Sequence, residues 1–118
     1  MTVEQQIRQQ AETLMNIPVS LGTEVKGQTY PYGVVYVISG VPNYTLTGND
    51  STKRKRLQIN VYATSYKEAK ELAISLYGID TLSSTNIKEV RVLNEVDLYD
   101  NEKQSFGVAI DIEVKEGN

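Results

Sequence analysis

Apolar residues recur at helical spacing at the start of the chain, and they predict an amphipathic helix there. Thr2 is a candidate N-cap, and Pro18 makes the helix end near Met15 or Asn16. The side chains expected on its buried stripe are those of Val3, Ile7, Ala11, Leu14 and Met15. The opposite face is rich in Gln and Glu and is expected to meet solvent.

A second helix is expected after Ser65. Glu68 follows Ser65 at the spacing of a capping box, and Gly78 occupies the position of a C-cap glycine. The predicted buried stripe consists of Ala69, Leu72, Ala73 and Leu76. Lys67, Lys70 and Glu71 are expected on the solvent side.

Strands are expected where β-branched residues cluster or where apolar and polar residues alternate. The run 33–39 is such a strand, residues 44–47 form a short partner strand, and 48–52 reads as a loop. The next strand begins at the basic run 53–56 and alternates from Leu57 to Ala63, which predicts one buried and one wet face.

Two more strands are expected near the end of the chain. The strand 89–98 turns through a hairpin loop at 100–103 into the strand 106–114, and residues 115–118 are expected to fray. Asn94 interrupts the apolar set, which indicates a bulge. The inward side chains of strand 89–98 are predicted to be Val90, Val92, Val96 and Leu98. The segments 17–31 and 79–88 are expected to be connections, the first with a short extended piece at most.

This order, α-β-β-(β)-α-β-β, predicts a single α+β domain over residues 1–118. Tight connections between successive strands favour a mostly antiparallel sheet of four to five strands. Two amphipathic helices are expected to pack on one face of that sheet.

Composition narrows the classes of function. The 118 residues include no Cys and no His, so the usual zinc sites and the nucleophile–base pairs built on His cannot form. We therefore expect no enzyme activity, no cofactor and no metal site. The chain has no apolar run of membrane-spanning length, and its polar start does not resemble a signal peptide. Synthesis in the cytoplasm and no membrane contact are expected.

Charge is distributed unevenly along the sequence. Residues 1–59 have a balance of +2 and residues 60–118 a balance of −5, within a net charge of −3. If these halves form separate basic and acidic surfaces, copies of the chain can meet head to tail.

The basic run is the first candidate for protein contact, through Lys53, Arg54, Lys55 and Arg56. Its partner is expected to be an acidic protein surface. The alternative is a solvated loop and strand start that protects a sheet edge. Nucleic acid is disfavoured as a partner, because four basic residues in an acidic chain give little affinity for phosphates.

A second group of candidates is acidic: Glu89, Glu95, Asp97, Asp100 and Glu102. Three interpretations are open, namely a metal site, a catalytic carboxylate pair at Glu95 and Asp97, and a surface that is solvated or faces another subunit. The last is favoured, because the sequence shows neither calcium-loop spacing nor a substrate pocket. Glu95, Asp97 and Asp100 are the contact candidates from this group.

Tyrosine is over-used, with eight Tyr against one Phe and no Trp. Tyr30, Tyr32, Tyr36 and Tyr44 cluster in the first sheet region, and Tyr62 lies on the expected wet face. Tyrosine suits interfaces because it combines apolar area with a polar tip. Tyr30, Tyr32 and Tyr62 are therefore candidate contacts, with partial burial at the rim of the sheet as the alternative.

The segment RLQINVYATSYKEAKELAISLY (56–77) resembles the strand-then-helix core of the tail-completion (tail-terminator) proteins of long-tailed bacteriophages and prophages. The C-terminal EVDLYDNEKQSFGVAIDIEV is similar to the ending of that family, and the order of elements also agrees. The Tyr-rich piece 30–44 and the basic run 53–56 depart from the family pattern. The positions that carry the resemblance are Arg56, Gln58, Ile59, Val61, Tyr62, Ala63, Ser65, Glu68, Ala69, Leu72 and Ala73.

The resemblance implies a structural role in the virion, at the joint between head and tail. Such subunits form a ring, commonly a hexamer, that caps the head-proximal end of the tail tube and ends its polymerisation. The implied partners are other copies of the chain, the tail tube protein and the head–tail connector proteins, with no cofactor. Two alternatives are a head–tail joining protein of the same neck and a small nucleic-acid-binding α+β domain that uses residues 53–56.

Overall fold

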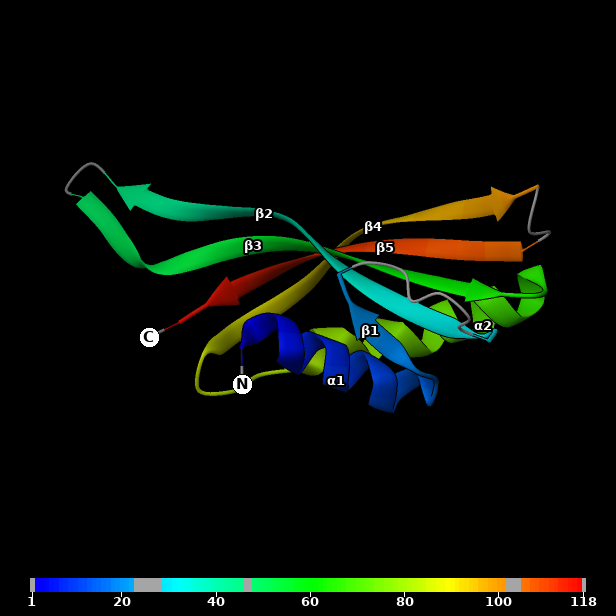
Figure 1. Ribbon diagram of the computed structural model, residues 1–118. Helices are drawn as coiled ribbons and strands as arrows, with labels where there is room; N and C mark the ends of the chain where they lie inside the picture. The colour runs from blue at the N-terminus through cyan, green and yellow to red at the C-terminus, as the bar shows by residue number, and fades with distance from the viewer. Residues whose placement is uncertain (1, 23–28, 46–47, 102–104, 118) are drawn as a thin grey trace.

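A twisted five-stranded sheet covered on one face by two helices forms the body of the protein (Figure 1). The computed structural model describes residues 2–22, 29–45, 48–101 and 105–117. In chain order the elements are α1 (Val3–Met15), β1 (Val19–Leu21), β2 (Tyr32–Thr45), β3 (Gly48–Ala63), α2 (Tyr66–Leu76), the 3-10 helix η1 (Tyr77–Thr81), β4 (Ile87–Asp100) and β5 (Ser105–Glu116). The strand order is β1-β2-β3-β5-β4.

The expected α+β fold is confirmed, with one refinement. The strands β2, β3, β5 and β4 are antiparallel, but β1 pairs with β2 in parallel, so the sheet is mixed. The pattern of residues 17–31 gave no clear strand, because β1 has only three residues and its partner lies more than ten residues further along the chain. The core lies between the helices and the facing side of the sheet, which we call the helix face; the other side is the open face.

Local signals fixed the starts of both helices. The backbone N–H of Gln5 donates to Thr2 Oγ1 at 3.1 Å and the N–H of Thr2 donates to Gln5 Oε1 at 2.8 Å, which completes a capping box. Ser65 Oγ accepts from the N–H of Glu68 at 3.2 Å. Helix α2 ends at Leu76, next to the end that Gly78 predicted, but the glycine does not adopt the left-handed conformation of a C-cap. The chain continues as η1 and buries Ile79 completely.

The hairpin of β2 and β3 is longer than the sequence indicated. The expected loop at 48–52 belongs to β3, and β2 continues past Gly40 and Pro42 to Thr45. Two register shifts, between Val37 and Ser39 and between Pro42 and Tyr44, absorb these breakers without ending the strand. The first residues of β3, 48–52, have β2 as their strand partner among the described residues and do not pair with β5. The hairpin of β2 and β3 therefore extends past the rest of the sheet (Figure 1).

The predicted bulge in β4 is confirmed by a register shift between Val92 and Asn94. Because of this bulge, the side chains that follow it point to the opposite faces of the sheet from those expected for a regular strand. Val90 is buried, but Val96 is 48% exposed, so the expectation that Val96 points into the core is wrong. Leu98 lies opposite Gly107 on the open face, so the expectation that Leu98 points into the core is also wrong.

The bulge leads to a stability prediction that separates two valines of one strand. We expect Val90→Ala to lower the free energy of unfolding by about 2 kcal/mol, because it leaves a cavity in the core. Val96→Ala should change it by no more than about 0.5 kcal/mol. Urea denaturation of both variants measures the difference. Equal losses would show that β4 keeps a regular alternation past Val92.

The C-terminal end of the described chain is held in place, contrary to the expectation of fraying from Lys115. Strand β5 continues to Glu116, and the N–H of Gly117 donates to the carbonyl of Asn86 at 3.2 Å. Pairing with β3 on one side and β4 on the other explains this extension, since Glu116 lies opposite both Lys53 and Ile87.

Candidate functional site

The basic run lies inside β3, where it pairs with β2 on one side and β5 on the other. The alternative interpretation of the basic run, a solvated loop that protects a sheet edge, is therefore wrong, because residues 53–56 are neither in a loop nor at an edge. Period-two alternation divides its side chains between the faces. Arg54 and Arg56 are exposed on the open face, Lys55 is half-buried on the helix face, and the side chain of Lys53 lies outside the described residues.

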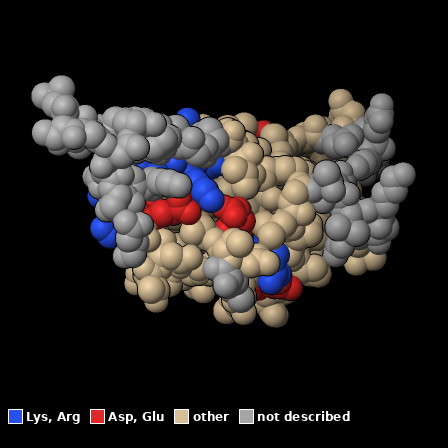
Figure 2. All heavy atoms as spheres, turned by 60° about the vertical axis from the view of Figure 1, so that its left-hand side comes forward, with Lys and Arg blue, Asp and Glu red and all other residues tan. Residues whose placement is uncertain are grey.

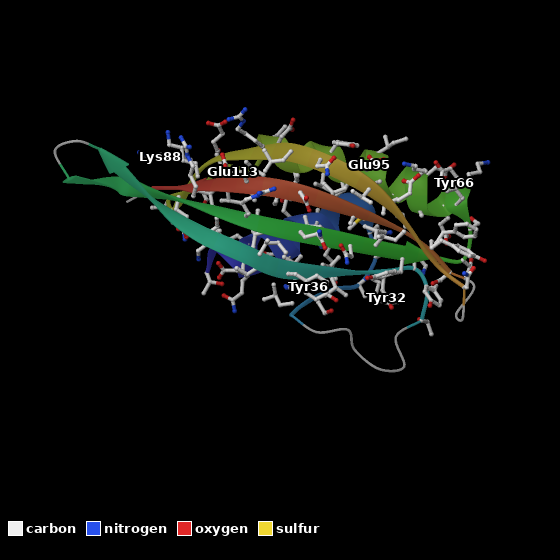
Figure 3. All side chains as sticks on the ribbon, turned by 90° about the horizontal axis from the view of Figure 1, so that it is seen from above. Tyr32, Tyr36, Tyr66, Lys88, Glu95 and Glu113 are labelled. Carbon is white, nitrogen blue, oxygen red and sulfur yellow. The ribbon has the colours of Figure 1, made fainter. Side chains whose placement is uncertain are left out.

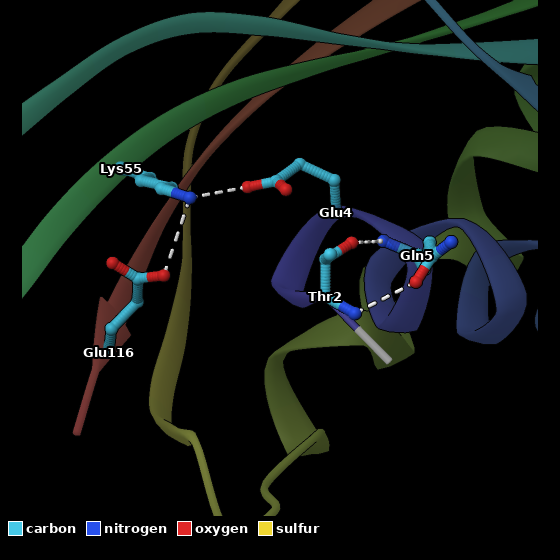
Figure 4. Close-up of polar contacts among 5 residues, drawn as sticks. All are labelled: Thr2, Glu4, Gln5, Lys55 and Glu116. Atoms are coloured by element: carbon cyan, nitrogen blue, oxygen red, sulfur yellow. Dashed lines mark hydrogen bonds and ion pairs between the residues drawn. The ribbon is translucent and has the colours of Figure 1, made fainter. Parts of the chain in front are cut away.

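Lys55 joins two distant parts of the fold. Its Nζ lies 2.6 Å from Glu4 Oε1 and 3.4 Å from Glu116 Oε1 (Figure 4). The hydrogen bond with Lys55 lowers the pKa of the Glu4 carboxyl, and the same contact raises the pKa of Lys55. Because this ammonium links the first turn of α1 to the end of β5, we interpret Lys55 as a structural residue and no longer as a contact for another protein.

Basic and acidic side chains alternate on the open face. Arg56, Glu113 and Arg91 lie opposite one another across β3, β5 and β4. A small hollow beside them is lined by Arg54, Glu89, Arg91, Glu113 and Lys115. In the side view of Figure 2, blue and red side chains also lie next to each other.

The prediction of separate basic and acidic surfaces is therefore wrong. The antiparallel pairing of β5 with β3 brings acidic residues of the second half of the chain beside the basic run of the first half. The structure thus removes charge separation as a basis for head-to-tail contact between copies.

Two of the acidic candidates point to the same side of β4, as their spacing predicted. Glu95 and Asp97 both contact Lys70 of α2, at 2.5 Å and 2.6 Å. The hydroxyl of Tyr77 donates to Glu95, and that of Tyr66 donates to Asp97 at 3.3 Å. The expected solvent position of Lys70 is corrected, since it fastens α2 to β4.

Helical periodicity gives no signal for this role of Lys70, so the sequence did not indicate it. The side chain of the third acidic candidate, Asp100, lies outside the described residues. Within the described ranges, no three acidic side chains are placed to hold a metal ion.

The contacts of Glu95 and Asp97 with Lys70 lead to a prediction of how the free energy of unfolding depends on pH. Hydrogen bonds from Lys70 lower the pKa of Glu95 and Asp97 below their ordinary values. In acid the unfolded chain therefore binds more protons than the folded one. The free energy of unfolding should be steady near neutral pH and fall as the pH drops below about 5.

Urea denaturation across this pH range tests the prediction. The fall should be shallower in Lys70→Met than in the wild type. Lys67→Met is the matched control, because Lys67 is on the same helix but 86% exposed, and its contact with Glu71 measures 4.0 Å. Identical pH profiles for Lys70→Met and the wild type would show that Lys70 does not lower the pKa values of Glu95 and Asp97.

The tyrosine candidates form a row on the open face. The rings of Tyr30 and Tyr32 lie 5.4 Å apart and those of Tyr32 and Tyr62 lie 5.2 Å apart, between centroids. Tyr32 is only 3% exposed, and Tyr62 accepts a hydrogen bond from Asn60 Nδ2 at 3.1 Å. These contacts favour the alternative of burial at the rim of the sheet over direct contact with a partner.

Exposed apolar residues gather instead at the two edges of the sheet. Among residues whose burial is described, none of the nine large exposed hydrophobics comes from the central strands β3 and β5. The first group, the β2 edge, consists of Leu21, Val37 and Ile38. The second group, the β4 edge, consists of Tyr66, Ile74, Tyr77, Leu93, Val96 and Tyr99.

Figure 3 shows the separation of the edges, with Tyr32 and Tyr36 along β2 and with Glu95 and Tyr66 on the opposite side. Two unlike apolar surfaces on one subunit allow a heterologous contact, in which one surface of each copy meets the other surface of the next. None of these residues is among the contacts predicted from the sequence. One signal was available, since the segment 32–45 has no charged residue.

A groove follows the β2 edge at the point where β1 stops. It has a volume of about 590 Å³. Its lining residues are Thr2, Glu4, Gln5, Leu21, Gly22, Val35, Tyr36 and Val37. The groove is mostly apolar where strand β2 forms its wall, which suits the side chains of an additional strand.

No helix in the described part of the chain has both the length and the apolar character needed to cross a membrane. No protein-family model matches the sequence, and no curated protein is significantly similar to it. Among solved structures, the chain is similar to one from the virion of a native gene transfer agent (GTA) particle. The TM-score is 0.69 at 12% identity, over 98% of this chain and 95% of that chain. At this identity, the likeness shows that the two chains share a fold over nearly their whole lengths.

Proposed function

We propose that this chain is a structural subunit of a phage-like virion, which forms a hexameric ring on the head-proximal end of a tail tube. In this role it ends tube polymerisation and presents a surface to the head connector. The observation that carries the proposal is the shared fold with a chain of the GTA virion over nearly its full length. The resemblance of residues 56–77 to tail-completion proteins supports the same role.

The two exposed edges support assembly into a ring. A closed ring of identical subunits needs two different, mutually complementary surfaces on each subunit. The β2 edge and the β4 edge lie on opposite sides of the sheet, which is the placement that a head-to-tail contact requires. The proposed role is architectural, and it involves neither catalysis nor a cofactor.

The test combines this protein with the tail tube protein of the same phage or prophage. We expect light scattering to show rings, either alone or on addition of tubes, and electron microscopy to show one end of each tube capped. Tubes assembled with the subunit present should be shorter than tubes assembled without it. A protein that stays monomeric at high concentration and leaves tube ends bare would contradict the proposal.

The same experiment distinguishes a head–tail joining role. A joining protein should bind isolated connectors and leave tube growth unchanged. Nucleic-acid binding is a weaker alternative, because Glu89 and Glu113 lie among Arg54, Arg91 and Lys115 and offset their charge. We expect no salt-sensitive retardation of DNA or RNA.

A further inference from the structure

Most of the outer edge of β2 has no neighbouring strand in the part of the chain that the structure describes. Strand β1 pairs only with Gly33–Val35, and the N–H of Gly22 donates to the carbonyl of Val35 at 2.9 Å where this pairing ends. From Val37 to Thr45, the strand partner of β2 within the described residues is β3 on its inner side. Backbone groups along such an edge are a template for another strand.

This edge carries two register shifts and Pro42, but it lacks the main feature that prevents association between sheets. Charged side chains are the usual protection, and the segment 32–45 has none. Val37 and Ile38 are each 55% exposed there. On the opposite edge, the bulge between Val92 and Asn94 and the charged residues before it protect the first half of β4, which leaves the segment after the bulge for pairing. The groove beside Leu21 and Val37 adds a place for the side chains of an incoming strand.

We infer that the outer edge of β2 from Val37 onward binds the β4 strand of a second copy, antiparallel to it, so that one sheet continues from subunit to subunit. The inference rests on the proposed ring and names its contact surfaces. Within a subunit β4 runs antiparallel to β2, because each step from β2 through β3 and β5 to β4 reverses direction. A rotation about an axis parallel to the strands does not change their direction. In a ring with such an axis, β4 of one copy is therefore antiparallel to β2 of the next copy.

The second half of β4 suits this contact. Tyr99 is 54% exposed and lies on the helix face, as Val37 does, so it provides apolar area for Val37 and the groove. Val96 is 48% exposed and provides apolar area on the open face of the same contact. Glu95 and Asp97 both form an ion pair with Lys70 of their own subunit. Approach of a second strand therefore does not bury an unpaired carboxylate there.

Disulfide crosslinking tests the pairing without interference, because the chain has no cysteine. One set of variants has Val37→Cys or Ile38→Cys, and the other has Leu93→Cys, Val96→Cys or Tyr99→Cys. Each member of the first set is mixed with each member of the second and oxidised under conditions in which rings form. We expect crosslinked dimers in at least one mixture, and little crosslinking when each variant is oxidised alone. Thr13→Cys, exposed on α1, is the control and should crosslink with neither set.

A second variant tests the edge without a disulfide. Val37→Lys places a charge on the edge, and we expect the concentration needed for ring formation to rise about tenfold or more. Val37→Thr, which keeps the strand preference without the charge, should assemble like the wild type. Both variants should unfold near the wild-type denaturant concentration, because Val37 is more than half exposed.

The outcomes separate the inference from the proposed function. If rings form and cap tubes, but no mixture crosslinks and Val37→Lys assembles normally, the strand pairing is wrong and the ring proposal stands. Strong crosslinking of Val37→Cys with itself would show a symmetric β2–β2 contact and also overturn the pairing. If the wild type neither forms rings nor binds tube ends, both fail together.

Discussion

Ile110→Ala is expected to lower the free energy of unfolding by roughly 2–5 kcal/mol, the range for large-to-small changes in a core. Ile110 is completely buried on the central strand β5, where it lies opposite Ile59 of β3. Removing its side chain leaves a cavity between the sheet and α2, which packs on β5 and β3. Because a domain of this size is stable by only about 5–15 kcal/mol, the variant should lose a large part of its stability.

The control for this variant is the same substitution on the surface. Ile74 is 68% exposed on α2, so Ile74→Ala should change the free energy of unfolding by less than about 0.5 kcal/mol. Chemical denaturation of both variants with the wild type measures the contrast. Similar losses at the two positions would show that the core is not where the structure places it. Ile74→Ala also tests the β4 edge, since weaker ring formation at unchanged stability would place Ile74 in the subunit contact.

Gly107→Val is expected to destabilise the fold by roughly 1–3 kcal/mol, because it forces atoms into filled space. A Cβ at this position would lie 3.0 Å from the carbonyl oxygen of Val61 and 3.1 Å from Cδ1 of Tyr62. The carbonyl belongs to β3, which is paired on both sides and has little freedom to move. The ring of Tyr62 packs against Tyr32, so displacing it disturbs the row of tyrosines on the open face.

Gly78→Ala is the matched control for this steric effect. A Cβ there would meet Leu14 Cδ2 at 3.1 Å, the end of a flexible and partly buried side chain. Gly78 also lies in the 3-10 helix, where alanine costs less backbone entropy than glycine. We therefore expect Gly78→Ala to leave the free energy of unfolding unchanged or raised, as measured by urea denaturation. A greater loss at Gly78 than at Gly107 would contradict the close packing described for the open face.

Local sequence signals determined the elements that depend on neighbouring residues. The start of α1 follows from Thr2 and the start of α2 from Ser65, because a cap involves residues only a few positions apart. Alternation from Leu57 to Ala63 and from Phe106 to Val114 predicted strands whose buried faces are confirmed. The bulge at Asn94 was also visible in the sequence, as one interruption in a run of apolar residues.

Only the tertiary structure decided which surfaces these elements form. The face on which Val96 and Glu95 lie depends on the exact register after the bulge, and a shift of one residue exchanges the two faces of a strand. Lys55 and Lys70 acquire carboxylate partners from elements 25 or more positions away, which no local pattern encodes. The exposed edges of β2 and β4 follow from the strand order, because long-range pairing determines which strands lie at the edges.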